Sequence, residues 1–314
     1  MKHYIGVDLG GTNIACGIVT EDGRIIAETS LPTLAHRPWN EVVPDIARAA
    51  KNAVAKAGLD VADMSGMGMG VPGICVGDTI PFCTNLGWHD VPIMKAMSEY
   101  IDLPLSVDND AVCAALAESV SGVSKSVPNS VFLTLGTGVG GGIIINNKPY
   151  AGTHGVGGEL GHLTIVVDGE MCTCGKRGCL ERYSSATAMI RMGVELMRKH
   201  PDSALFTATE GDPSRMTAKI VVDAAKAGDY AAKRVFGDYV KYLTIGINNI
   251  ITFIDPDMVV LGGGVSHAGN FLLDAVREEI GNYIFYRSLP YADIELATLG
   301  NEAGIIGAAM LASL

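Results

Sequence analysis

Three cysteines and a histidine crowd into one short segment of the chain. His162, Cys172, Cys174 and Cys179 follow the pattern H-x9-C-x-C-x4-C, and two glycines between the last two cysteines allow a tight turn. Three thiolates and one imidazole form a common tetrahedral ligand set for Zn²⁺. Four protein ligands leave no open coordination position. The spacing therefore predicts a structural zinc site, and the alternative is three free thiols beside a core histidine.

Three glycine-rich turns each follow an apolar run, and they are Gly10-Gly11-Thr12, Gly136-Thr137-Gly138 and Gly262-Gly263-Gly264. Glycine lets backbone N–H groups approach an anion closely, because no Cβ intervenes and positive φ is available. Thr12 and Thr137 add hydroxyl donors. Three such turns favour a nucleotide phosphate site. Asp8, just before the first turn, has the chemistry to orient Mg²⁺ through water, or to cap the turn that follows.

Residues 136–141 also match the G-x-G-x-x-G pattern of dinucleotide-binding proteins. In that fingerprint the glycines open a helix, whereas residues 143–148 have the pattern of a strand and a hairpin turn. The chain has no Walker A sequence either. These patterns disfavour a nicotinamide-dependent oxidoreductase and a P-loop, and they predict a phosphate site of the two-lobed hairpin type.

Carboxylates and amides cluster at predicted turns, and they are Asn85, Asn109, Asp110, Glu159 and Glu181. Asp110 follows a predicted strand, where a carboxylate can accept the proton of an attacking hydroxyl in phosphoryl transfer. Asp108 competes with Asp110 on residue type, and Asn109-Asp110 is also a common N-cap for a following helix. The mixed donors and acceptors that a polyhydroxyl ligand needs are offered by Asn85, Asn109, Glu159 and Glu181.

The elements that must position these residues form an α/β pattern. The opening strand and glycine turn, residues 5–12, recur at residues 131–138, which predicts two related α/β lobes with a cleft between them. Residues 83–88 are expected to be a loop. Strands are expected at 4–9, 14–19, 24–31, 66–71, 105–108, 131–135, 143–145 and 259–261, and helices at 41–57, 92–100, 111–120, 184–199, 218–227, 229–254, 270–281 and 302–314.

Composition excludes several classes of function. The 314 residues are 48% hydrophobic and 18% charged, with a net charge of −11. A surface that negative disfavours a general nucleic-acid binder. No apolar run of about 18 residues occurs, so no membrane span is predicted, and the start of the chain has no signal-peptide pattern. An odd number of cysteines, three of them in one cluster, fits a reducing compartment, so a cytoplasmic protein is expected.

At this point the motifs form a recognisable set. They are Asp8–Asn13, Thr84–Trp88, Val107–Ala111, Leu135–Gly142, Gly157–His162, the cysteine segment ending Cys179-Leu180-Glu181, and Leu261–Gly264. Over essentially the whole chain the sequence resembles the ROK family of bacterial sugar kinases and regulators, within the actin/hexokinase-like superfamily. The resemblance implies a two-lobed, ribonuclease H-like α/β fold with a duplicated mixed-sheet core and an interlobe cleft. It implies an N-terminal lobe of residues 1–120 and a C-terminal lobe of 121–314 carrying the zinc loop, with the last helix packed back on the N-terminal lobe.

The same resemblance, closest to the ATP-dependent glucokinases of the family, implies an activity and a site. The activity is transfer of the γ-phosphoryl group of ATP to the 6-hydroxyl of glucose, with Mg²⁺ and a structural Zn²⁺, in a homodimer or homotetramer. Asp110 is implied as the general base. Sugar hydroxyls would be bound by Asn85, Asn109, Glu159, His162 and Glu181, with His162 also on zinc. The nucleotide would be held by Asp8, Gly10, Gly11, Thr12, Asn13, Thr137, Gly138, Gly263 and Gly264.

One residue departs from the family pattern. Many relatives carry a second Asn two residues after the base, where this chain has Val112, which leaves the preferred sugar epimer open. Mannose, N-acetylmannosamine, allose and glucosamine derivatives are the alternatives within the class. A sugar-responsive repressor is the alternative outside it. Repressors of the family carry an N-terminal helix-turn-helix, for which a first strand beginning by Tyr4 is expected to leave no room.

Overall fold

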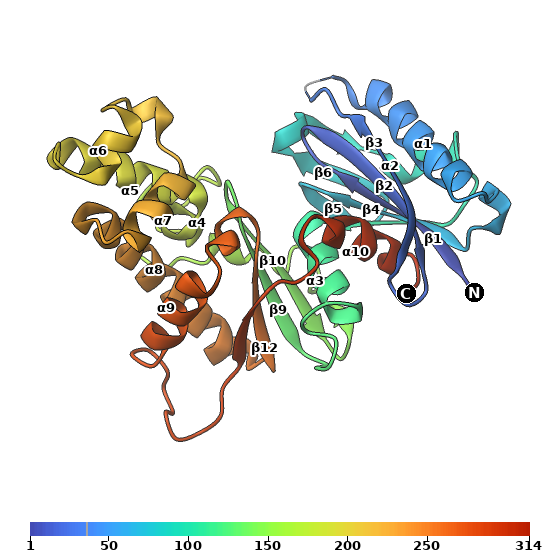
Figure 1. Ribbon diagram of the computed structural model, residues 1–314. Coiled ribbons are helices and arrows are strands. Elements are labelled where there is room, and N and C mark those ends of the chain that lie inside the picture. The colour runs from blue at the N-terminus through green and yellow to red at the C-terminus, as the bar shows by residue number, and fades with distance from the viewer. Residues whose placement is uncertain (36) are drawn as a thin grey trace. The chain divides into compact units, whose positions relative to one another are not determined.

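The computed structural model describes residues 1–35 and 37–314, and its contacts divide the chain into two compact units (Figure 1). The N-terminal unit comprises Met1–Phe132, Gly142–Gly158 and Thr298–Leu314, and the C-terminal unit comprises Leu133–Gly141 and Glu159–Ala297. Neither unit is one continuous stretch of sequence, so the chain passes from one to the other repeatedly. The lobe boundaries expected from the sequence, 1–120 and 121–314, stay a prediction.

The first sheet belongs to the N-terminal unit. It has the order β3-β2-β1-β4-β8, and its strands are β1 (His3–Leu9), β2 (Asn13–Thr20), β3 (Ile25–Pro32), β4 (Gly66–Val71) and β8 (Leu105–Asn109). Strands β1, β2 and β3 pair antiparallel, whereas β1, β4 and β8 pair parallel. Parallel strands place their carboxyl ends at one edge of a sheet. Asp8, Gly70 and Asp108 therefore align in one row across three strands.

Helices cover this sheet because its strands are apolar on both faces. Helix α1 (Trp39–Lys56) packs on β1, β2 and β3, and it ends where Gly58 adopts a positive φ of 72°. Helix α10 (Ala303–Leu311) packs on β1, β2 and β4 and on α3 (Asp110–Val120). That contact is very close, since a Cβ at Gly6 or Gly68 would overlap backbone carbonyls of α10. The small residues of these strands admit the helix.

The second sheet has the order β11-β10-β9-β12-β13, and its strands are β9 (Ser130–Leu135), β10 (Val139–Ile145), β11 (Lys148–Pro149), β12 (Met258–Gly262) and β13 (Asp293–Leu296). Counted within each half of the chain, both sheets have the strand order 3-2-1-4-5. The pair β10 and β11 is antiparallel and the pair β12 and β13 is parallel, as at the matching positions of the first sheet. The predicted duplication of a mixed-sheet α/β core is confirmed.

The C-terminal unit also contains the helices α4 (Glu181–Ser184), α5 (Ala186–Lys199), α6 (Ala204–Thr209), α7 (Ala218–Lys226), α8 (Tyr230–Ile254) and α9 (Asn270–Ile280). Side chains at the starts of α5, α6, α7 and α8 accept backbone N–H groups, as Ser185 does for α5 and Asp229 for α8. The helix expected at 184–199 is interrupted at Ser185. That residue has an extended backbone, caps α5 and leaves α4 as a separate turn.

A small antiparallel sheet in the N-terminal unit was not expected. It has the order β5-β6-β7, with β5 (Ile74–Val76), β6 (Thr79–Cys83) and β7 (Trp88–Val91), followed by α2 (Ile93–Ser98). The loop expected at 83–88 is wrong at both ends, where Cys83 pairs with Trp88. Both side chains are buried, so the turn between them is held by the core. That turn and five others are 3₁₀ helices, namely Thr84–Leu86, Val61–Asp63, Leu160–His162, Pro213–Arg215, Gly264–Ala268 and Gly300–Glu302.

Two further findings concern the cysteines and the hydropathy of the helices. The seven cysteines are free thiols. Across residues 1–35 and 37–314, no helix combines the length and the apolar character that crossing a bilayer requires.

Candidate active site

Two aspartates lie in one row, with strand β4 between them, at the edge where the parallel strands of the first sheet end. Asp8 on β1 and Asp108 on β8 pair with opposite sides of Gly70 on β4. Burial raises the pKa of both carboxyls, and for Asp108 the hydrogen bond from the Asn109 N–H partly opposes the effect. Helix α10 begins against Asp8, since a Cβ at Gly304 would overlap that carboxylate. This edge is therefore a negatively charged, partly desolvated site suited to a cation.

Asn109 and Asp110 form the junction between β8 and α3. The Asn109 side chain caps the helix, with Oδ1 accepting the Ala111 N–H at 2.8 Å, while its Nδ2 donates to the Gly73 carbonyl at 3.1 Å. Asp110 is the first residue of α3, and its Oδ1 also accepts the Ala111 N–H at 2.8 Å. The N-cap interpretation thus holds for Asn109. Asp110 is half-buried at the start of the helix.

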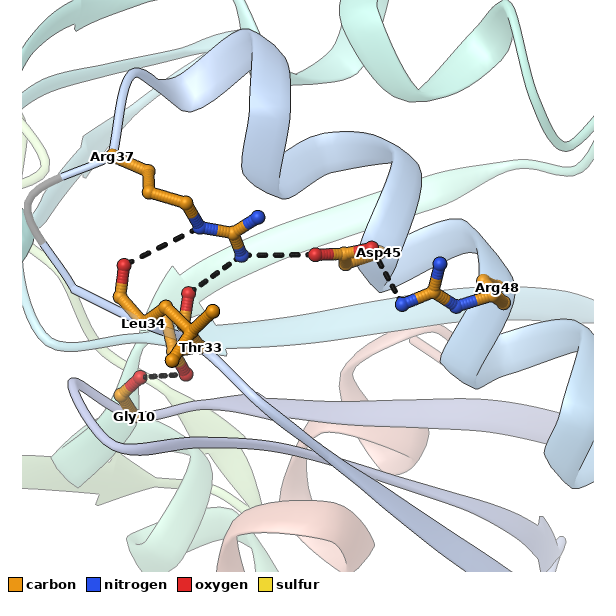
Figure 2. Close-up of polar contacts among 6 residues, drawn as sticks. All are labelled: Gly10, Thr33, Leu34, Arg37, Asp45 and Arg48. Atoms are coloured by element: carbon orange, nitrogen blue, oxygen red, sulfur yellow. Dashed lines mark hydrogen bonds and ion pairs between the residues drawn. The ribbon is translucent and has the colours of Figure 1, made fainter.

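The first glycine turn is held from one side by Thr33. Its hydroxyl donates to the Gly10 carbonyl at 2.6 Å (Figure 2), and its N–H donates to the Thr12 carbonyl at 2.8 Å. The Thr33 carbonyl in turn accepts Nη2 of Arg37, which also binds Asp45 at 2.9 Å. The exposed side chains in this region include Thr12, Asn13 and Asn85, and a Cβ at Gly11 would lie 3.9 Å from the Asn85 carbonyl oxygen.

The second glycine turn is held from one side by the start of α5. The Ala186 N–H donates to the Gly136 carbonyl at 2.8 Å, and the Thr187 hydroxyl donates to the Thr137 carbonyl at 2.7 Å. The turn is closed by the Gly136 N–H, which donates to the Gly138 carbonyl at 3.0 Å.

The third glycine turn packs against the strand that leads into the second turn. Gly263 has a φ of 81°, and a Cβ there would lie 2.6 Å from the Leu135 nitrogen. Gly263 and Gly264 are exposed. The second and third turns are therefore adjacent in the C-terminal unit, at the carboxyl ends of β9 and β12.

The cysteine and histidine cluster assembles as the spacing predicts. The ligand atoms of His162, Cys172, Cys174 and Cys179 all lie within 4.8 Å of one another. Sγ of Cys172 is 3.7 Å from Nδ1 of His162, and Sγ of Cys174 is 3.6 Å from Sγ of Cys179. Tetrahedral bonds of about 2.3 Å to sulfur and 2.1 Å to nitrogen separate neighbouring ligand atoms by about 3.6–3.8 Å. The donor set and its spacing fit a zinc ion.

Glu181 lies between this cluster and the second glycine turn. Its Oε1 accepts the Cys172 thiol at 2.9 Å and is 3.9 Å from Nδ1 of His162. Its Oε2 would be 2.8 Å from a Cβ at Gly138. Burial and the hydrogen bond to Glu181 raise the pKa of the Cys172 thiol to about 12. Glu159 is exposed, and its carbonyl accepts the His162 N–H at 3.0 Å.

A sequence model of a known protein family, described as the ROK family, matches residues 4–314 of this chain. The chain belongs to the ROK family. It is 38% identical to the glucokinase of Halalkalibacterium halodurans, over 99% of this chain and 94% of that protein. Among solved structures, a ROK family glucokinase from Streptomyces griseus, in complex with glucose and AMPPNP, superposes with a TM-score of 0.83 at 34% identity, covering 99% of each chain.

Further members show the breadth of the ROK family. The ROK hexokinase of Thermus thermophilus is 32% identical, with a TM-score of 0.85 over 99% of this chain and 98% of that one. The xylose repressor of Caldicellulosiruptor bescii is 29% identical over 96% of this chain and 76% of its own length. The predicted actin/hexokinase-like fold is confirmed by the glucokinase and hexokinase structures.

In this ROK protein the predicted site residues are divided between the two units. The N-terminal unit holds Asp8, Gly10, Gly11, Thr12, Asn13, Asn85, Asn109 and Asp110, and the C-terminal unit holds Thr137, Gly138, Glu159, His162, Cys172, Cys174, Cys179, Glu181, Gly263 and Gly264. Sequence reasoning missed Thr33 and Thr187, which hold the first two turns. Thr33 bonds a carbonyl 23 residues away and Thr187 bonds one 50 residues away. No local sequence pattern predicts such contacts.

Proposed function

We propose that the protein is an ATP-dependent hexose kinase that transfers the γ-phosphoryl group to the 6-hydroxyl of glucose. The observation that carries the proposal is the likeness, over nearly the full length of both chains, to a ROK glucokinase crystallised with glucose and AMPPNP. The likeness to curated glucokinases at 34–38% identity supports it.

Asp110 is the proposed general base. Its carboxylate takes the proton of the sugar 6-hydroxyl while the oxygen attacks the γ-phosphorus, the bond from that phosphorus to the bridging oxygen breaks, and ADP leaves. Its position as the first residue of α3 supports this role, because the helix dipole favours the ionised carboxylate there. Asp108, at the end of β8 in one row with Asp8, is the competing candidate.

The glycine turns are the proposed nucleotide site. Gly10, Gly11, Thr12, Asn13, Thr137 and Gly138 would hold the phosphates, and Gly263 and Gly264 would flank the adenosine. Asp8 would orient Mg²⁺, which neutralises charge on the phosphates when bound. The pairing of Asp8 with the neighbouring strand end supports that role, because it places the carboxylate at the edge of the sheet.

The proposed zinc site is structural and adjoins the sugar. Nδ1 of His162 faces the cysteines, which leaves Nε2 to bind a sugar hydroxyl and fixes the tautomer. Asn85, Asn109, Glu159 and Glu181 would complete the sugar contacts. The bond from the Cys172 thiol to Glu181 needs the thiol proton, and that proton leaves when a thiol becomes a zinc ligand. Zinc binding would therefore free Oε1 of Glu181 for a sugar hydroxyl.

Three finer properties belong to the same proposal. We expect a homodimer or homotetramer in the cytoplasm, where ATP and reduced thiols are available. We expect glucose rather than mannose, N-acetylmannosamine or allose as the preferred sugar. Val112, where many relatives have Asn, is buried on α3, and its aliphatic side chain has no polar group to offer a sugar.

Coupled ADP release with Mg-ATP tests the function across a panel of hexoses and amino-hexoses. We expect glucose to be preferred and Asp110→Asn to lower kcat by about 10²- to 10⁴-fold, with zinc content unchanged. Asp108→Asn is the matched control, because it makes the same change two residues away. Greater loss in the Asp108 variant would reverse the assignment of the base. Preference for another sugar would correct the substrate, and no turnover by folded, zinc-loaded protein would refute a kinase.

A further inference from the structure

The first two glycine turns differ in sequence, but the same arrangement of hydrogen bonds holds both of them. In each, a threonine outside the turn donates its hydroxyl to a turn carbonyl, Thr33 to Gly10 at 2.6 Å and Thr187 to Thr137 at 2.7 Å. In each, a backbone N–H holds a second carbonyl, from Thr33 in the first turn and from Ala186 in the second. Both turns are thus fixed from one side by a threonine and a backbone amide.

The direction of these bonds determines where the N–H groups of the turns point. In a planar trans peptide the C=O and the next N–H point in opposite directions. Holding the Gly10 carbonyl therefore turns the Gly11 N–H away from Thr33. In the same way, holding the Gly136 and Thr137 carbonyls turns the N–H groups of Thr137 and Gly138 away from α5.

These N–H groups remain available for a ligand. Within residues 1–35 and 37–314, the N–H groups of Gly11, Thr137 and Gly138 donate no hydrogen bond to the protein. The Thr137 side chain is exposed and its two neighbouring glycines are half-buried. Successive N–H groups directed to one side form a concave site that binds anions.

We propose that Thr33 and Thr187 are positioning residues for phosphoryl transfer, which hold turn carbonyls back so that the N–H groups of Gly11, Thr137 and Gly138 face the phosphates of the nucleotide. The inference rests on the proposed kinase function. Neither threonine contacts the nucleotide in this scheme, and each acts through the carbonyl that it binds.

Thr33 and Thr187 differ in their burial and in their contacts with the rest of the protein. Thr33 is fully buried, and its carbonyl accepts Arg37, which Asp45 holds in turn (Figure 2). Thr187 is exposed on the first turn of α5 and packs little. Replacing Thr187 with Val therefore removes the hydroxyl and keeps the shape at small cost in stability, which makes Thr187 the cleaner test.

The experiment compares Thr187→Val, Thr187→Ser and wild type by steady-state kinetics, by AMPPNP titration calorimetry and by thermal unfolding. We expect Thr187→Val to weaken AMPPNP binding and raise the KM for ATP by about threefold to tenfold, the loss of one hydrogen bond. The KM for glucose and the melting temperature should stay unchanged. Thr187→Ser, which keeps the hydroxyl, should restore ATP binding.

Matched controls separate this effect from general loss of a hydroxyl. Thr207 is an exposed helix threonine of the same unit whose hydroxyl bonds the Ser203 carbonyl, and Thr207→Val should change nothing. For Thr33→Val the control is Thr29→Val, which removes a hydroxyl bond to the Ala49 carbonyl in the same unit. Thr33→Val should raise the KM for ATP more than Thr29→Val does.

Two results would count against different claims. If Thr187→Val phosphorylates glucose with wild-type KM for ATP and binds AMPPNP normally, the positioning role is wrong. A fall in stability with equal losses for both substrates would also overturn it. If the wild type shows no sugar phosphorylation, the proposed function fails instead. AMPPNP binding by wild type and Thr187→Val then still tests whether the turn binds phosphate.

Discussion

Glu118 and Thr298 lie 180 residues apart, yet the Glu118 carboxylate accepts both the N–H and the hydroxyl of Thr298, at 2.8 and 3.1 Å. The N–H groups of Leu299 and Val123 donate to the same carboxylate, at 2.9 and 2.8 Å. Glu118 is fully buried near the end of α3. It therefore fixes the point where the chain re-enters the N-terminal unit at Thr298.

Glu118→Gln should destabilise the protein by about 1–3 kcal/mol. The amide NH2 would face N–H donors, so at least one buried donor loses its acceptor. Thr298→Val removes only the hydroxyl bond and should cost less, so the order of the two losses in urea unfolding is itself a check. Equal stability of Glu118→Gln and wild type would mean that the carboxylate is dispensable there.

Gly68→Ala should destabilise the protein by about 1–3 kcal/mol or prevent folding. Its Cβ would overlap the Ala308 carbonyl of α10, and overpacking of this kind forces backbone shifts. Gly66→Ala is the matched control, because it lies two residues away on β4 and its Cβ would be 3.4 Å from Ala312. Chemical unfolding of both variants measures the difference, and similar midpoints would contradict the close packing of α10.

Gly138→Ala should raise the KM for glucose by about tenfold. The new methyl group would be 2.8 Å from Oε2 of Glu181 and would displace that carboxylate, which we propose binds the sugar. Gly136→Ala has open space around its Cβ and tests the same turn without touching Glu181. A change in the KM for glucose that is equal in both variants would show that the turn, not Glu181, is responsible.

Cys174→Ser should lower the melting temperature through loss of the metal. The Cys174 side chain is exposed, so its replacement removes a proposed zinc ligand with little loss of packing. Zinc content by mass spectrometry and unfolding with and without a chelator measure the effect. After chelation the variant and the wild type should melt alike. A variant that stays less stable than chelated wild type would point to packing instead.

The stability of Asp108→Asn relative to wild type should depend on pH. Burial raises the pKa of Asp108 in the folded protein, so its contribution to stability is full below the unfolded pKa of about 4 and is lost as pH rises through the folded value. Asparagine does not ionise. The variant should therefore gain stability over wild type as pH rises from about 4 through the folded pKa, as followed by urea unfolding at several pH values.

The control for this pH dependence is Asp102→Asn, which changes an exposed carboxyl of the same unit. It should leave the pH profile of unfolding close to that of wild type. The stability difference between Asp108→Asn and wild type should grow as pH rises. If it is constant or shrinks, desolvation of the Asp108 carboxyl does not govern the pH dependence.

Much of the fold could be predicted because its signals are local. The apolar run ending at Leu9 and the glycine turn after it predicted β1, and their recurrence near Leu135 predicted the duplicated sheet that the strand order confirms. The cysteine cluster was predictable for the same reason, since His162 and Cys179 lie within one short segment. Local patterns place a turn or a ligand set without knowledge of the rest of the chain.

The missed features depend on contacts between distant segments. Strand β13 is only four residues long, and it forms by pairing with β12, about 35 residues earlier. Residues 83 and 88 are strand ends because their side chains enter a core assembled from other elements. The bonds of Thr33 and Thr187 to turn carbonyls carry no periodicity. The effect of these bonds on the site can be recognised only from the three-dimensional structure of the turns.

The packing of α10 on β1 and β4 has a consequence for biosynthesis. The strands of the first sheet all precede residue 110, but the helix that covers one of their faces is formed by residues 303–311. The nascent chain must therefore carry an apolar, half-covered sheet until residues 303–311 have left the ribosome. Exposed surface of this kind invites aggregation and engages chaperones. The core of the N-terminal unit is therefore completed only after the residues of the C-terminal unit have been synthesised.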